Sequence, residues 1–310
     1  MTGLALEVWR GGVSAWECDE MGHLNVRFHL ARAVEGLAGV AQGLGLAGAF
    51  TATPPLTLIV REHHARFHRE CHPGMALHMT AGVTEMGQDD AQVLQMLLNS
   101  TTGEVCATFL TRLALVSAPD RVPRPWPACA RELGLGLACD IPPEAAPRGV
   151  TGGPIHSLAS RARADALGMT TLGRGAVQPQ DCDVFGRMRP EILIGRINAG
   201  FPHLVRPLRE AVAQALDLQG RVGGAALEYR LIYLDHPPAG TAFELRSGLA
   251  ALDAKRMRMN HWLIDAVTGQ VVATAQNVSV NLDLKLRSAI ALPPDIEAAM
   301  QAHVIQDLSM

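Results

Sequence analysis

The order of apolar and polar positions predicts one long helix followed by several strands. Between residues 26 and about 46 apolar side chains recur at helical spacing, and nearly every face of this helix is apolar. Short alternating or β-branched runs at residues 4–9 and 13–17 predict two strands before the helix. The runs that predict strands after it are at residues 56–62, 76–86, 90–100 and 105–116. A buried helix followed by an antiparallel meander indicates a sheet that curls around the helix.

The same order of elements occurs a second time, as an internal duplication. Residues 17–25 match residues 181–189 at a separation of 164 residues (183 − 19), with an acid, a cysteine, an aspartate and a glycine in the same order. Residues 102–108 match residues 268–274 at a separation of 166 residues (269 − 103). Several matching blocks in one order predict two copies of one unit, the second with a helix that begins near Pro190.

A segment of different character separates the two copies. Prolines recur there beside glycines, and because proline fixes φ and lacks a donor, no long regular element is expected apart from a short helix at residues 130–137. The predicted organisation is an N-terminal repeat at 1–118, a linker at 119–154, a C-terminal repeat at 155–290, and a tail at 291–310 with a short helix.

Composition narrows the classes of function. The chain is 48% apolar and 18% charged with a net charge of −3, and it lacks a basic tail, so nucleic acid is not an expected partner. No stretch has the roughly 20 apolar residues of a membrane-spanning helix, and the amino terminus lacks the pattern of a signal peptide. The six cysteines form no CxxC pair, which predicts reduced thiols and a cytoplasmic location.

One motif points to a family. The segment from Asp19 to Asn25, just before the buried helix, resembles the Asp-x-x-Gly-His-x-Asn signature of hot-dog acyl-CoA thioesterases. The tandem layout and residues 227–230 are similar to the acyl-ACP thioesterase branch. The resemblance implies an α+β double hot-dog, two repeats each with a long central helix wrapped by a curved antiparallel sheet, paired into one continuous sheet. It also implies hydrolysis of acyl-CoA or acyl carrier protein thioesters in fatty acid metabolism, without a cofactor.

The resemblance assigns roles by position. Asp19 attacks the thioester carbonyl or activates a water to do so, and the backbone N–H of Val26 stabilises the oxyanion, because helix amino termini offer unsatisfied donors. Gly22 lets the substrate approach the backbone. His23 and Asn25 orient Asp19 or the water. An isolated aspartate at this position would be interpreted as a helix cap, but the complete motif favours catalysis.

The second repeat departs from this pattern. Pro190 stands at the position of Val26 and has no N–H to donate. Arg187 replaces His23, while Asp183 keeps the aspartate. We therefore expect the working site in the first repeat, with Asp183 and Arg187 as a second or vestigial site.

Other candidate residues have weaker support. The run from Arg61 to Arg69 is rich in cations and imidazoles, and Arg61, His63 and His64 are candidate contacts for CoA phosphates or an acidic carrier protein, although a solvent-facing strand is favoured. Adjacent histidines of a strand point to opposite faces, so no metal site is expected. Cys18 and Cys182 are assigned to core packing, and Glu35 to the solvated helix surface.

Two other functions stay open. One is a hot-dog enoyl-thioester hydratase or dehydratase, whose Asp and His are further apart than Asp19 and His23. The other is a non-catalytic acyl-thioester-binding protein. The sequence leaves open the acyl chain, the choice between CoA and acyl carrier protein, and a homodimer of double hot-dogs.

Overall fold

The computed structural model describes residue 4 and residues 6–310, and the chain divides into two compact units. Unit 1 comprises Met1–Pro147 and Cys182–Glu191, and unit 2 comprises Arg148–Asp181 and Ile192–Met310. The second-repeat motif loop is thus grouped with the first repeat. Within the described residues, no helix combines the length and apolar character needed to cross a membrane.

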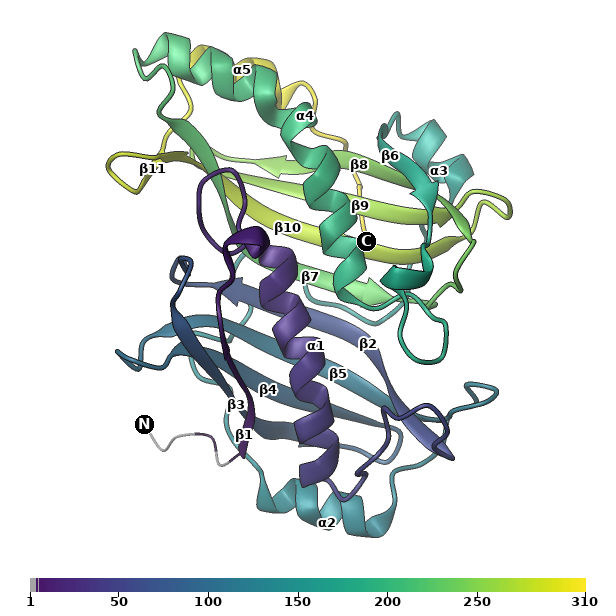
Figure 1. The fold of residues 1–310 in the computed structure, drawn as a ribbon. Coiled ribbons are helices and arrows are strands. Elements are labelled where there is room, and N and C mark those ends of the chain that lie inside the picture. The colour runs from purple at the N-terminus through teal and green to yellow at the C-terminus, as the bar shows by residue number, and fades with distance from the viewer. Residues whose placement is uncertain (1–3, 5) are drawn as a thin grey trace. The chain divides into compact units, whose positions relative to one another are not determined.

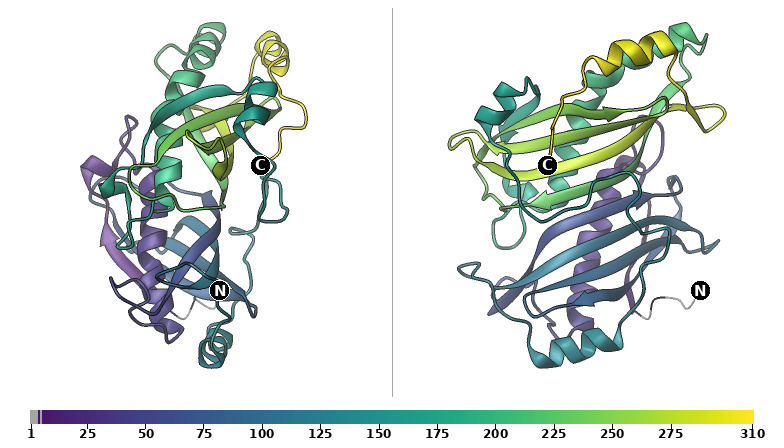
Figure 2. Two further views of the ribbon diagram at one scale, coloured as in Figure 1. Left: turned by 90° about the vertical axis from the view of Figure 1, so that its right-hand side faces the viewer. Right: turned by 180° about the vertical axis from the view of Figure 1, so that it is seen from behind.

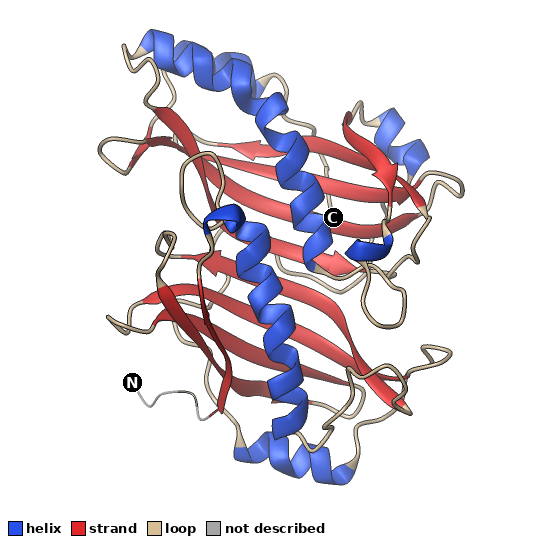
Figure 3. Cartoon of the chain, in the orientation of Figure 1, coloured by secondary structure: helices blue, strands red, loops and turns tan. Residues whose placement is uncertain are grey.

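Unit 1 is an antiparallel sheet with one long helix. The sheet has the strand order β1-β3-β4-β5-β2, and α1 packs against β1, β3 and β5, lying on one side of the strands (Figures 1 and 3). The elements in chain order are β1 (Leu6–Gly12), the 3₁₀ turn η1 (Ala15–Glu17), α1 (Val26–Gly43), β2 (Leu56–Phe67), β3 (Ala76–Met86), β4 (Asp90–Asn99), β5 (Val105–Ser117) and α2 (Ala128–Gly136).

Unit 2 has the same strand order, β7-β10-β9-β8-β6, with β11 paired to β10. Its long helix α4 runs across its own strands, and α5 contacts β8 (Figures 1 and 2). The elements in chain order are α3 (Arg161–Ala166), β6 (Thr170–Ala176), η2 (Pro179–Asp181), α4 (Glu191–Ala215), β7 (Val222–Tyr233), β8 (Ala242–Leu252), β9 (Arg256–Asp265), β10 (Val271–Asp283), β11 (Ser288–Ile290) and α5 (Pro294–Gln301).

The duplication extends to irregularities of the backbone. The register of β2 against β5 shifts at Arg61, and that of β7 against β10 shifts at Leu227, 166 residues later (227 − 61). The registers within β3 and β8 shift at Thr84 and Ala250, again at this separation (250 − 84). A β-bulge is a specific local feature rather than a consequence of strand length, so its recurrence confirms the predicted repeat.

One predicted strand is wrong. Residues 13–17 end in η1, where Ser14 and Glu17 form a reciprocal capping box and the Glu17 carboxylate accepts from the Ser14 N–H at 3.0 Å. The spacing Ser-x-x-Glu favours a helical turn over an extended chain, and this local signal outweighs the apolar alternation. The strand predicted at residues 4–9 is β1, although residue 5 lies outside the described residues.

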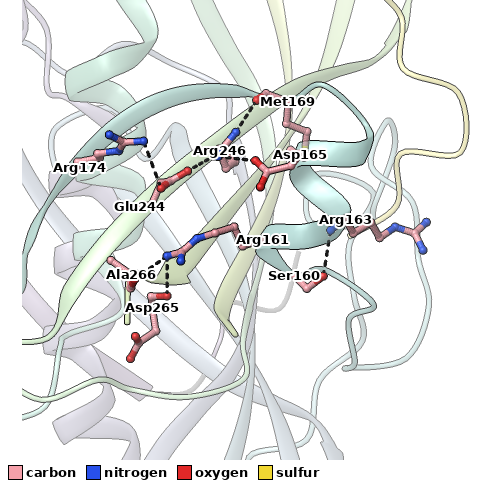
Figure 4. Close-up of polar contacts among 10 residues, drawn as sticks. All are labelled: Ser160, Arg161, Arg163, Asp165, Met169, Arg174, Glu244, Arg246, Asp265 and Ala266. Carbon is pink, nitrogen blue, oxygen red and sulfur yellow. Dashed lines mark hydrogen bonds and ion pairs between the residues drawn. The ribbon is translucent and has the colours of Figure 1, made fainter. Parts of the chain in front are cut away.

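In unit 2 a network of arginines holds α3 to the sheet (Figure 4). Arg246 donates to the Asp165 carboxylate at 2.7 Å and to the Met169 carbonyl at 3.0 Å, and it also pairs with Glu244. Arg161 donates to the Ala266 carbonyl at 2.7 Å. These guanidinium groups bind backbone and carboxylate groups of their own unit, so we assign them a structural role.

Candidate active site

The segment from Asp19 to Leu24 forms a closed loop before α1. Cys18 and Leu24 make an isolated antiparallel bridge at its base. The Asp19 N–H donates to the His23 carbonyl at 3.0 Å, and the Gly22 N–H donates to the Asp19 carbonyl at 3.0 Å. Gly22 has φ +78°, a conformation that glycine adopts at little cost, which explains the glycine of the motif.

The loop directs the Asp19 carboxylate toward His23. Asp19 Oδ1 accepts from the Met21 N–H at 2.9 Å, and Oδ2 lies 3.3 Å from His23 Nδ1. Their side chains are 16% and 15% exposed. Burial raises the pKa of Asp19 above its ordinary value, while the nearby His23 and backbone donors oppose the shift. A partly desolvated carboxylate with a raised pKa is suited to accept a proton.

The sequence did not identify Glu70 and His72, which complete a chain of polar groups. Glu70 Oε1 lies 3.7 Å from His23 Nε2, and Glu70 Oε2 lies 3.8 Å from His72 Nε2. His72 Nδ1 is 3.3 Å from the Gly22 carbonyl oxygen. The Leu24 N–H donates to the Cys71 carbonyl at 2.7 Å, which brings this distant turn to the motif loop.

A comparison of the repeats contains a signal for these two residues. At the separation that aligns the strands, Glu70 corresponds to His236 and His72 to Pro238. The acid and the imidazole are therefore specific to the first repeat.

Asn25 and Val26 form the start of α1. Asn25 is the N-cap, and its side-chain oxygen accepts from the Arg27 N–H at 2.9 Å. Val26 is the first helical residue, so its N–H is among those without an acceptor inside the helix. The helix amino terminus thus follows directly after the loop that carries Asp19.

A buried ion pair supports the loop from below. Glu17, whose side chain is 2% exposed, pairs with Arg32 of α1. In the second repeat Asp181 pairs with Arg196 in the corresponding place. Since the pair recurs in both repeats, we interpret it as a structural anchor between the 3₁₀ turn and the helix.

The second motif loop keeps the backbone of the first but has different side chains. The Asp183 N–H donates to the Arg187 carbonyl at 2.8 Å, and Asp183 Oδ1 accepts from the N–H groups of Phe185 and Arg187 at 2.9 and 3.0 Å. Asp183 Oδ2 lies 3.6 Å from the Arg121 guanidinium, not from an imidazole. This aspartate therefore lies beside a permanent cation.

The histidines of β2 do not face solvent, so that interpretation of the Arg61–Arg69 run is wrong for them. His63 and His64 are 0% and 5% exposed, and His63 Nδ1 is 2.9 Å from Thr111 Oγ1. His64 is the register partner of Leu110, which packs with Ala145.

The physical reason is that a segment predicted as linker covers the other face of this sheet. Arg66 donates to the Pro143 carbonyl at 2.7 Å, and Thr108 donates to the Glu144 carbonyl at 3.2 Å. Arg61, at the bulge, stays partly exposed. Glu35 is exposed at 59% as predicted, and it accepts a hydrogen bond from the Trp9 indole at 2.8 Å.

A family model described as the thioesterase-like superfamily matches residues 13–146 and 177–300. No curated protein sequence matches the chain significantly. The two matched segments contain both motif loops and most of both sheets.

Solved structures match across both units. A 12:0-ACP thioesterase from Umbellularia californica has a TM-score of 0.66 at 13% identity, covering 88% of this chain and 93% of that one. An acyl-ACP thioesterase from Bacteroides thetaiotaomicron has a TM-score of 0.60 at 10% identity, covering 87% and 96%. At such identities these matches establish the fold, and with the family match they confirm the resemblance to hot-dog thioesterases.

Proposed function

This chain belongs to the thioesterase-like superfamily, and we propose that it hydrolyses acyl thioesters of CoA or of an acyl carrier protein at one site, built around Asp19. The observation that carries the proposal is the chain of groups from Asp19 through His23 to Glu70, which the second repeat lacks. An acyl thioester requires a base beside the carbonyl carbon and donors for the oxyanion. The motif loop and the start of α1 supply groups of both kinds.

In the proposed reaction Asp19 acts as general base. It takes a proton from a water molecule as the water oxygen adds to the thioester carbonyl, and the N–H of Val26 donates to the resulting oxyanion. Collapse of the tetrahedral intermediate breaks the C–S bond, and the proton held by Asp19 passes to the departing thiolate. The products are a carboxylic acid and a free thiol. Direct attack by the carboxylate, through a mixed anhydride that water then cleaves, is the alternative with the same residue.

Supporting residues keep Asp19 in place. His23 contacts the second carboxylate oxygen, and Glu70 lies beside the far nitrogen of the same ring, an arrangement that restricts the imidazole. Asn25 starts the helix that carries the oxyanion donor. Gly22 has open space where a Cβ would be, which leaves room for substrate. Among the β2 candidates, partly exposed Arg61 fits a contact with a carrier phosphate better than buried His63 and His64.

The test is release of free thiol from acyl-CoA of several chain lengths and from acyl carrier protein. Asp19→Asn is expected to lower kcat by about 10²–10⁴-fold, the range that general bases contribute. Asp183→Asn is the matched control in the second motif loop and is expected to keep activity within about threefold, because its carboxylate contributes no base to the reaction. Activity that survives Asp19→Asn but not Asp183→Asn would falsify the assignment. Hydration of an enoyl thioester without thiol release would replace hydrolysis by the hydratase alternative.

A further inference from the structure

His29, in the first turns of α1, is a buried imidazole that the proposed reaction does not use. It is 4% exposed, its ring meets that of Phe67 edge to face at 5.4 Å, and its Nδ1 atom has no hydrogen-bond partner among the described residues. Burial lowers the pKa of His29 to about 3, and the nearby cationic groups of His23 and Arg32 act in the same direction. The ring is therefore neutral throughout the physiological range.

The second repeat shows that the fold has no need of a histidine at this position. The corresponding residue, at the 164-residue separation that aligns the motif loops, is Leu193, which is 0% exposed in α4. A buried polar atom without a partner costs about 1–3 kcal/mol, whereas leucine at the same place has no such cost. The first repeat thus keeps an unfavourable residue where an apolar one is accommodated.

The location of His29 indicates why. It lies beneath the motif loop, where its ring interacts with the backbone of Leu24 and with the charge of His23. Unpaired buried groups that are retained at a cost are typical of sites where a ligand completes the hydrogen bonding. The other polar groups specific to the first repeat, His23 and Glu70, belong to the candidate active site.

We propose that His29 is a substrate-binding residue of this site, whose neutral ring forms a hydrogen bond with an amide of the pantetheine arm that CoA and acyl carrier protein share. The inference rests on the proposed function. It assigns to the first repeat a contact that the leucine of the second repeat cannot make.

The test replaces His29 by the residue of the other repeat and measures folding and activity separately. His29→Leu is expected to unfold at the same urea concentration as the wild type or a higher one, and to lower kcat/KM for acyl-CoA at least about tenfold, the equivalent of 1.4 kcal/mol. For a simple alkyl thioester that lacks amide groups, the same variant is expected to keep kcat/KM within about twofold. Opposite changes in stability and activity distinguish a binding role from a packing role.

Two further variants make the result interpretable. His29→Asn places an amide near the position of Nδ1 and is expected to recover most of the activity, which also covers the case in which His29→Leu does not fold. His68→Leu is the matched control, because His68 also has an unpaired ring nitrogen and also corresponds to a leucine, Leu234. It is expected to leave kcat/KM for acyl-CoA unchanged.

The outcomes separate the two proposals. A wild type without thioesterase activity overturns the proposed function, whatever His29 does. A wild type that hydrolyses acyl-CoA, with a folded His29→Leu variant of equal kcat/KM, overturns only the inference about His29. Equal losses on acyl-CoA and on the amide-free thioester also overturn it, since they would mean that His29 acts through the reacting groups.

Discussion

Arg32 of α1 reaches the carboxylate of Glu17, which is almost completely buried under the motif loop. The second repeat has the same relationship between Arg196 and Asp181, and in each repeat the guanidinium also lies over an aromatic ring. The acid in the 3₁₀ turn and the arginine in the helix are 15 residues apart in both repeats. This anchor fixes the turn to the helix, and it holds the loop with the catalytic aspartate between them.

We expect Arg32→Met to destabilise the protein by about 3–5 kcal/mol, because it leaves the buried Glu17 carboxylate without a counter-ion. Urea unfolding measures this change. Arg10→Ala, which removes an exposed ion pair with Glu7, is the control and should change the free energy of unfolding little. Equal effects of the two variants would show that the Glu17–Arg32 pair is no anchor.

The acid limb of the pH profile should depend on both Asp19 and His23. Catalysis requires ionised Asp19, and its pKa is raised by burial, so kcat/KM should begin to fall at a pH above the ordinary carboxyl value of 3.8. Because the charge of His23 lowers the pKa of Asp19, His23→Gln should move this limb to higher pH. Profiles of kcat/KM against pH for the two proteins test this, and an acid limb that stays in place or moves down contradicts it.

The same raised pKa has a consequence for stability. A carboxyl group whose folded pKa lies above its unfolded value stabilises the protein below the unfolded value, and that stability is lost as the pH rises through the folded value. At pH 7 Asp19→Asn should therefore be more stable than the wild type, and the difference should shrink on acidification below pH 3.8. Urea unfolding at both pH values decides it. A less stable variant at pH 7 would mean that the carboxylate has a structural role.

Unit 2 contains a second buried histidine, and it should make stability depend on pH. His261 bonds Ser247 and Asn277 through its two ring nitrogens, and burial lowers its pKa from 6.5 to about 4. The folded state therefore binds fewer protons than the unfolded state, and about 3 kcal/mol of stability present above pH 6.5 is lost as the pH falls towards 4.

The first repeat supplies the variant that tests this prediction. Gln95 occupies the corresponding position, and it bonds Thr111 and the Ala33 carbonyl without titrating. His261→Gln should remove the component assigned to His261 while keeping a hydrogen-bonding side chain. Unfolding free energies between pH 4 and 7 provide the comparison, and equal slopes for variant and wild type would refute the assignment.

The sequence predicted local elements well, because hydrophobic period and turn residues are local properties. The strand β3 and the start of α1 at Val26 agree with the structure, and the duplication is visible in both. Contacts between distant segments were not predictable in this way. Glu70 reaches His23 only because the turn after β2 bonds Leu24, and the burial of His64 depends on a segment that looked like a linker. The strand predicted at 13–17 failed because a capping box outweighed the alternation.

The glycine that recurs in both long helices marks a close approach to the first strand of each repeat. A Cβ at Gly200 would lie 2.6 Å from the carbonyl oxygen of Leu172 in β6, and one at Gly36 would lie 3.1 Å from Cγ2 of Val8 in β1. Alanine is favoured over glycine inside a helix by about 1 kcal/mol, but overpacking against backbone costs about 1–3 kcal/mol. We therefore expect Gly200→Ala to destabilise the protein in urea unfolding, because the Leu172 carbonyl cannot move without disturbing the strand. Gly136→Ala, which places its Cβ in open space near the end of α2, should be neutral or stabilising. If Gly200→Ala were as stable as Gly136→Ala, α4 would have to lie further from β6 than the structure shows.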